Sequence, residues 1–208
     1  MNKEDWKKFW KKFWFIVWKD DSFKGWVISV IFILIVIKLI FFPILTLASG
    51  SSLPLVIVES CSMYHEGSIF SNFDNWWGRH ESKYFQEKIT KPTFLDFPFK
   101  NGLNKGDILF VAGVKPKNVK VGDIIIFDAG ERNPIIHRVI NIKNESGVYT
   151  LSTLGDNNNG QLYVEQKINQ DQLVGKPVAN IAPWVGWIKL IFFEHTKPTQ
   201  ERGFCKEN

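Results

Sequence analysis

One stretch decides how this chain is organised: Val56-Ile57-Val58-Glu59-Ser60-Cys61-Ser62-Met63-Tyr64-His65. Its first three residues are β-branched, which favours a strand, and the strand delivers two serines and a methionine. A long apolar segment lies just upstream. A membrane-bound hydrolase would hold its nucleophile just beyond its anchor. Ser60 and Ser62 are therefore the first candidate site residues.

The chain is long enough for a membrane anchor and one folded domain. It has 208 residues, a formal net charge of +5 and two cysteines, Cys61 and Cys205. Its lysines crowd the first 24 residues beside tryptophans, which favours a membrane surface over nucleic acid as the partner. Two cysteines so far apart do not make a disulfide framework, so we expect both to be free thiols.

Residues 1–25 are predicted to form a cytoplasmic, amphipathic segment at the membrane surface. Large apolar residues recur at positions 6, 9, 10, 13, 14, 17 and 18, and lysines fill the opposite face. This is a helical period, and Trp and Lys are the residues that settle at lipid headgroups. A helix packed inside a soluble protein is the alternative.

Residues 26–48 are the predicted transmembrane helix. Apart from Ser29, Lys38 and Thr46 they are apolar, and roughly 20 such residues span a bilayer core. A central lysine costs roughly 2.5–3.5 kcal/mol, which the apolar neighbours outweigh. Lys38 would snorkel outward or meet an acidic residue on a partner helix.

The orientation of this anchor follows from its flanking charge. Seven lysines lie in the first 24 residues, so the positive-inside rule keeps the N-terminus in the cytoplasm and the rest of the chain outside. Cleavage after Ala48, as in a secretory signal, would instead release a soluble β protein.

Residues 49–193 are predicted to form a mainly β, antiparallel, partly closed domain. Short runs rich in Val, Ile, Phe and Tyr are separated by turn residues, with no long helical pattern between them. The expected strands are Leu55 to Val58, Ile108 to Val111, Ile124 to Phe127, Ile135 to Ile142, Val148 to Ser152 and Val174 to Ile181.

Three parts of the chain lie outside this β pattern. The aromatic insertion at 70–104, which begins with Phe70, is a lid, a flap resting on the membrane, or a small helical satellite of the core. Residues 181–193 are too interrupted to span a bilayer; they lie at the interface or pack as a closing strand and helix. We expect residues 194–208 to be a polar, frayed tail.

The base that would activate a serine is either a lysine with a strongly lowered pKa or a histidine. Serine is a weak nucleophile and needs a partner that accepts its proton near neutral pH. Histidine suits this task, and between residues 106 and 180 the chain has one histidine, His137. A hydrogen-bonded structural histidine is the alternative for a single histidine in a strand.

The order of three motifs resembles the signal peptidase I family, in its archaeal and endoplasmic-reticulum branch. These are Ser60-Cys61-Ser62-Met63, His137-Arg138-Val139 and Gly155-Asp156-Asn157-Asn158. In the bacterial branch a lysine stands at the place of His137. The resemblance covers roughly residues 26 to 193 and is weakest across the insertion.

The resemblance implies a role for each matching residue. Ser62 would be the nucleophile, His137 the general base, and Ser60 would help the backbone N–H of Ser62 to form the oxyanion hole. Asp156 would orient His137, or it is a turn residue that caps the asparagines after it. No metal or cofactor is expected.

Two positions depart from the family pattern. Cys61 stands where the family usually has glycine between its serines. Leu162 stands where many members carry a second aspartate, which leaves the third catalytic residue open, with Glu165 or Asp171 as distant substitutes.

The function that the resemblance implies is removal of signal peptides from preproteins by a membrane-anchored serine endopeptidase. Its expected partners are preproteins, the lipid bilayer and secretion machinery. The alternative is a catalytically silent, membrane-tethered β domain that serves as a scaffold or subunit of a secretion complex.

Overall fold

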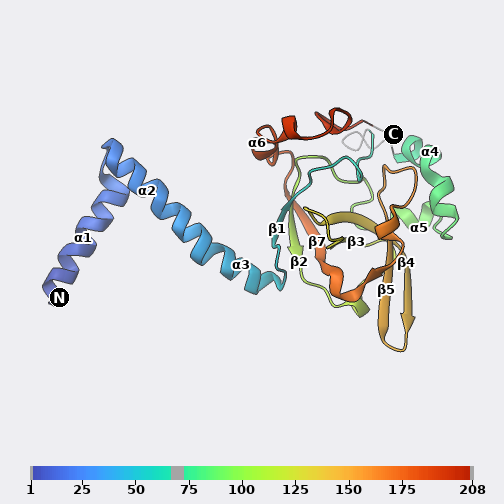
Figure 1. The fold of residues 1–208 in the computed structure, drawn as a ribbon, viewed down its shortest axis with the longest axis horizontal. Coiled ribbons are helices and arrows are strands. Elements are labelled where there is room, and N and C mark those ends of the chain that lie inside the picture. Colours follow the sequence, from blue (N-terminus) through green and yellow to red (C-terminus); the bar gives the residue numbers. More distant parts are fainter. Residues whose placement is uncertain (1, 67–72, 207–208) are drawn as a thin grey trace. The chain divides into compact units, whose positions relative to one another are not determined.

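The fold is described from a computed structural model, which describes residues 2–66 and 73–206. The chain divides after Ala48 into two compact units. The first contains the N-terminal helices and the second contains all the strands (Figure 1).

The N-terminal unit is built from helices with defined caps. Helix α1 spans Lys3–Lys19 and α2 spans Phe23–Val36. The side chain of Ser22 caps α2 by accepting a hydrogen bond from the backbone of Gly25 at 3.1 Å, as N-cap serines do. The two helices pack together through the rings of Phe13 and Phe32, whose centroids are 5.2 Å apart.

The apolar helix continues without interruption from Phe23 to Ser49, 27 residues, and an 18-residue window within it has a mean hydropathy of 3.0. Within the described residues this is the one helix long and apolar enough to cross a membrane. A π-helical turn at Ile37–Phe41, which contains Lys38, joins α2 to helix α3, Phe42–Ser49.

The second unit is a curled antiparallel sheet of seven strands, ordered β1-β2-β7-β3-β4-β5-β6 (Figure 1). Its strands are β1 Leu55–Ile57, β2 Ile108–Ala112, β3 Ile124–Phe127, β4 Ile135–Glu145, β5 Val148–Leu154, β6 Ile168–Asn169 and β7 Leu173–Ala182. The mainly β prediction with N-terminal helices is confirmed. The two-residue strand β6 was not predicted because it is too short to form a pattern.

The aromatic insertion forms helices α4, Phe73–Phe85, and α5, Lys91–Leu95. Trp76, Tyr84 and Phe94 are fully buried there and share one core cluster with Ile140 of β4. Of the three alternatives, this packing matches the helical satellite of the core. Phe70, which also belongs to the predicted insertion, lies outside the described residues.

The C-terminal part does not fray. After β7 the chain forms the short helix α6, Trp187–Leu190, in which Leu190 is buried and Ile188 is 72% exposed. Residues 194–206 then fold back on the sheet domain through hydrogen bonds from Lys105 and Lys197 and through a disulfide. The expectation of a frayed tail is wrong for these residues because buried partners hold them.

Candidate active site

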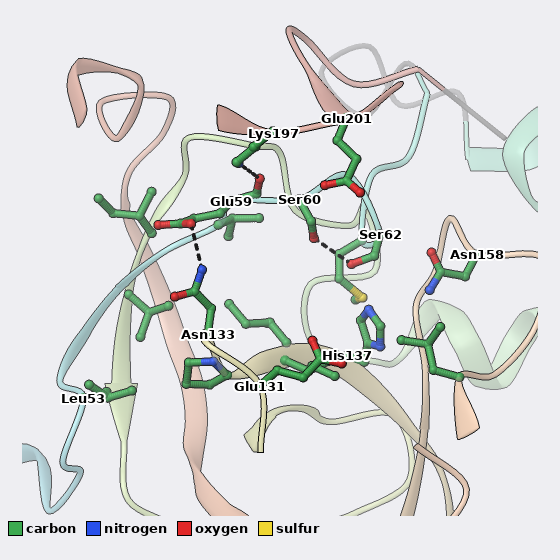
Figure 2. A pocket seen from close by; sticks show the side chains of 18 of the residues that line it. Leu53, Glu59, Ser60, Ser62, Glu131, Asn133, His137, Asn158, Lys197 and Glu201 are labelled. Atoms are coloured by element: carbon green, nitrogen blue, oxygen red, sulfur yellow. Dashed lines mark hydrogen bonds between the residues drawn. The ribbon is translucent and has the colours of Figure 1, made fainter. Parts of the chain in front are cut away.

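A groove of about 560 Å³ opens between β1 and the start of β4. One wall is the end of β1 and the turn after it, which carries Ser60 and Ser62. The other wall is the segment from Pro134 to His137. Figure 2 shows Ser62 and His137 facing the same hollow, so the fold brings these two predicted site residues together.

The turn after β1 is held by its neighbours. The hydroxyl oxygens of Ser60 and Ser62 lie 3.0 Å apart, at hydrogen-bonding distance. The backbone N–H of Asn157 donates to the carbonyl of Ser62 at 2.7 Å. This contact joins the turn to the Gly-Asp-Asn-Asn segment, so the first and third sequence motifs meet in the structure.

His137 lies in β4, opposite Ile125 of β3, and its side chain is 3% exposed. Its Nε2 atom lies close to Gly155, where a Cβ would come within 2.9 Å of it. A larger residue at position 155 would therefore displace the imidazole.

The carboxylate on the other nitrogen of this imidazole belongs to Glu165. Its Oε1 atom is hydrogen-bonded to His137 Nδ1, and the side chain of Glu165 is fully buried. It also accepts hydrogen bonds from the Thr153 hydroxyl at 3.0 Å and from the Leu162 backbone at 2.8 Å. A carboxylate in this place fixes the tautomer and orientation of an imidazole.

The hydrogen bonds of Asp156 connect it to groups other than His137, the residue that it was expected to orient. Its carboxylate instead accepts hydrogen bonds from Arg138 at 2.7 Å, from the Tyr84 hydroxyl at 2.7 Å and pairs with His65 Nε2 at 2.9 Å. Successive side chains of a strand point to opposite faces. His137 therefore faces the groove, whereas Arg138 points into the interior, where it binds Asp156.

The buried network around Asp156 has displaced pKa values. Burial alone would raise the pKa of Asp156, but the charge of Arg138 and the hydrogen bond from His65 hold it far below its ordinary value. Burial lowers the pKa of His65, against the opposing effect of Asp156. Burial also raises the pKa of Tyr84 well above 10.0.

The shifts of His65 and Asp156 change stability with pH in the same direction. A histidine or an aspartate whose pKa is lower in the folded than in the unfolded chain binds fewer protons when folded. Folding therefore loses stability as the pH falls, first below about 6.5 through His65 and then below about 3.9 through Asp156.

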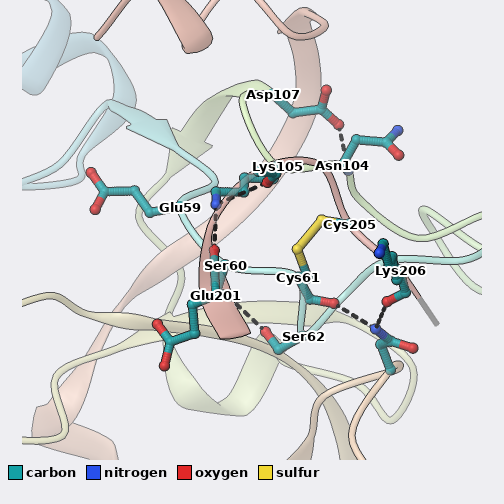
Figure 3. Close-up of a disulfide and its surroundings, with 12 residues drawn as sticks. Glu59, Ser60, Cys61, Ser62, Asn104, Lys105, Asp107, Glu201, Cys205 and Lys206 are labelled. Carbon is teal, nitrogen blue, oxygen red and sulfur yellow. Dashed lines mark hydrogen bonds between the residues drawn. A yellow bond between two sulfur atoms is a disulfide. The ribbon is translucent and has the colours of Figure 1, made fainter. Parts of the chain in front are cut away.

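The two cysteines form a disulfide, so the expectation of free thiols is wrong. Cys61 and Cys205, 144 residues apart in sequence, have Cα atoms separated by 5.3 Å. Figure 3 shows the bridge beside Ser60 and Ser62. Sequence spacing could not reveal this pair, because the fold of the C-terminal residues brings Cys205 to the turn.

Comparison with known proteins points to one class, the signal peptidases. No family model matches the chain, and no solved structure matches it. Relatives that match include catalytic subunits of the signal peptidase complex, and the resemblance found in the sequence motifs is confirmed.

Two relatives illustrate the extent of this similarity. The subunit SEC11 of Candida albicans is 34% identical over 97 residues, which are 44% of this chain and 58% of the relative. SEC11C of Homo sapiens is 30% identical over 105 residues, 45% of this chain and 52% of the relative. The chain thus spans little more than half the length of the curated relatives it matches.

Proposed function

We propose that this protein is a membrane-anchored serine endopeptidase that removes signal peptides from preproteins. The observation that carries the proposal is the shared groove of Ser62 and His137, with the Glu165 carboxylate bound to the far nitrogen of His137. The similarity to signal peptidase catalytic subunits supports the choice of substrate.

In this mechanism Ser62 attacks the scissile carbonyl and forms an acyl-enzyme. Nε2 of His137 accepts the proton of the Ser62 hydroxyl and then gives it to the leaving amine. Water deacylates the enzyme by the same proton route. Glu165, already bound to Nδ1, holds the imidazole in the tautomer that leaves Nε2 free to act as a base.

Ser60 is the candidate side-chain donor of the oxyanion hole. Its hydroxyl is exposed and lies next to that of Ser62, and together with the backbone N–H of Ser62 it would bind the negative charge of the tetrahedral intermediate. One donor of this kind contributes roughly 3 kcal/mol to transition-state stabilisation.

The substrate would bind as an extended strand in the groove. Strand β1 is at the edge of the sheet and lines the groove together with the segment from Pro134 to Ile136. An added strand makes main-chain hydrogen bonds to such an edge and places alternate side chains in pockets. The apolar helix Phe23–Ser49 would hold the enzyme at the membrane from which signal peptides emerge, with the β domain outside the cytoplasm.

The test is cleavage of a preprotein by the full chain in detergent micelles. We expect Ser62→Ala and His137→Ala each to abolish cleavage while thermal unfolding of the protein changes little. Labelling of the native protein by a serine-directed fluorophosphonate should be lost in Ser62→Ala, whereas Ser52→Ala, on an exposed serine, serves as the matched control. Cleavage that survives in Ser62→Ala would refute the enzyme assignment and favour a tethered scaffold.

A further inference from the structure

The C-terminal segment 194–206, called the strap below, is anchored to the sheet domain by a buried cation. Lys105 is 2% exposed and its ammonium group binds the Glu194 carboxylate at 2.8 Å, the Glu201 carbonyl at 2.7 Å and the Gly203 carbonyl at 3.1 Å. An ammonium group has three donors, and the strap occupies all of them. The strap is therefore an integral part of the fold.

The same strap holds the turn that carries the serines. Lys197 donates to the carbonyl of Glu59 at 2.7 Å, one residue before Ser60. Cys205 is bonded to Cys61, the residue between the two serines (Figure 3). The backbone on both sides of Ser60 is thus fixed by a residue of the strap.

A bridging side chain adds a third connection. The Asn157 amide donates to the Cys61 carbonyl at 3.1 Å and to the Lys206 carbonyl at 3.0 Å. The strap also reaches the groove directly, because Lys197 and Glu201 are among the residues that line it (Figure 2). The turn that carries Ser60 and Ser62, called the nucleophile turn below, therefore forms one connected unit with the groove wall and the strap.

We propose that the strap positions the nucleophile turn, with Cys205 as a positioning residue, and that the disulfide makes peptidase activity depend on the redox state of the compartment. This rests on the proposed function of Ser62. The side chain of Cys61 connects the turn to the strap through the disulfide.

The chemistry of the switch is ordinary thiol–disulfide exchange with a dithiol. One thiolate of the reductant attacks a sulfur of the bridge, and the other protein sulfur leaves as a thiolate. The second thiol of the reductant then displaces the remaining protein sulfur. The protein gains two electrons and two protons, and the reductant becomes a disulfide. Both cysteines are half-buried, so a small dithiol can reach the bridge.

Reduction would leave the turn held by hydrogen bonds alone. Ser62 would then sample positions away from His137, and a misplacement of about 1 Å can cost on the order of 100-fold in rate. We expect kcat for preprotein cleavage to fall between about tenfold and 100-fold on reduction, and fluorophosphonate labelling of Ser62 to slow by a similar factor. Labelling by a small reagent reports the geometry of the nucleophile without use of the whole groove.

The experiment compares the oxidised and dithiol-reduced full chain in detergent micelles, with bridge opening verified by the mass of alkylated cysteines. The double variant Cys61→Ser/Cys205→Ser should show the slow rate with and without reductant. Lys197→Ala keeps the bridge and removes the contact with the Glu59 carbonyl; we expect a several-fold lower labelling rate. The control is Lys117→Ala, at an exposed lysine in the short 3₁₀ turn Pro116–Asn118. We expect its labelling rate to equal that of wild type.

The outcomes separate this proposal from the one on which it rests. If the oxidised wild type neither cleaves preprotein nor is labelled at Ser62, the proposed function fails. If it cleaves and its labelling rate stays within twofold after verified reduction, the strap proposal is refuted. If reduction unfolds the protein, the Lys197→Ala variant tests the proposal instead. A labelling rate of this variant equal to that of wild type refutes positioning by the strap.

Discussion

Two buried carboxylates lie within reach of the second motif, and conservative substitutions can separate their roles. Asp156 binds Arg138, whereas Glu165 binds His137. Asp156→Asn and Glu165→Gln each remove one charge and keep the shape of the side chain. We expect the first to reduce mainly stability and the second mainly the rate.

The expected cost of Asp156→Asn follows from its surroundings. Both Asp156 and Arg138 are fully buried, and the substitution leaves the guanidinium without its counter-charge. Breaking a buried pair in this way costs about 3–5 kcal/mol. For a domain of this size that is a fall in melting temperature of roughly 6–20 °C. The substitution leaves the proposed catalytic groups in place. We therefore expect kcat, measured below the unfolding transition, to stay within about tenfold of wild type, which is about 1.4 kcal/mol in activation free energy.

Glu165→Gln acts on the imidazole itself. The amide oxygen can still accept from His137 and Thr153, but its NH₂ group faces the Leu162 N–H, a mismatch that costs about 1–3 kcal/mol. The larger effect is on catalysis, because an amide can present its NH₂ group as well as its oxygen to His137 Nδ1, so it no longer fixes the required tautomer, and a neutral group does not stabilise the imidazolium. The corresponding change in a serine protease triad lowers kcat about 10⁴-fold, and we expect a loss of about 10²–10⁴-fold here.

The assay is preprotein cleavage at a temperature below the melting point of both variants, with thermal unfolding measured in the same detergent. A Glu165→Gln rate near that of wild type would refute the assignment of Glu165 as the orienting acid. A loss in Asp156→Asn as large as that in Glu165→Gln, with the fold intact, would return the orienting role to Asp156.

Two further outcomes are expected. Ser60→Ala should lower kcat about 10²-fold with little change in KM, and an equal kcat would exclude Ser60 from the oxyanion hole. Melting temperatures of His65→Gln should depend less on pH than those of wild type between about pH 6.5 and 4, whereas His195→Gln, on an exposed histidine, should keep the wild-type slope.

Much of the fold was predictable because its signals are local. Six strands follow from short β-branched runs between turn residues, and the helix from Phe23 to Ser49 follows from a long, mostly apolar run. Ser62 and His137 were also predicted to lie near each other, since each occurs in a motif and the order of the motifs resembles one family. The groove then brings both side chains together.

The missed features depend on contacts between distant parts of the chain. Cys205 reaches Cys61 through the fold of the strap, which Lys105 and Lys197 bind to the domain, and no local pattern around either cysteine reports this. Glu165 was open as a substitute, but a distance of nine residues from Asp156 gave no reason to prefer it. The 3₁₀ turn Tyr163–Glu165 returns the carboxylate to the imidazole.

The different partners of Asp156 and Glu165 follow from the dipeptide His137-Arg138. Because adjacent residues of a strand face opposite sides, a base directed into the groove necessarily sends its neighbouring cation into the core. A buried cation needs a counter-charge, and Asp156 supplies it from the same segment whose Asn157 backbone binds Ser62. Asp156 is bound to Arg138, and in the proposed mechanism a second acid orients His137 from the groove side. In this chain Glu165 is the carboxylate that lies there.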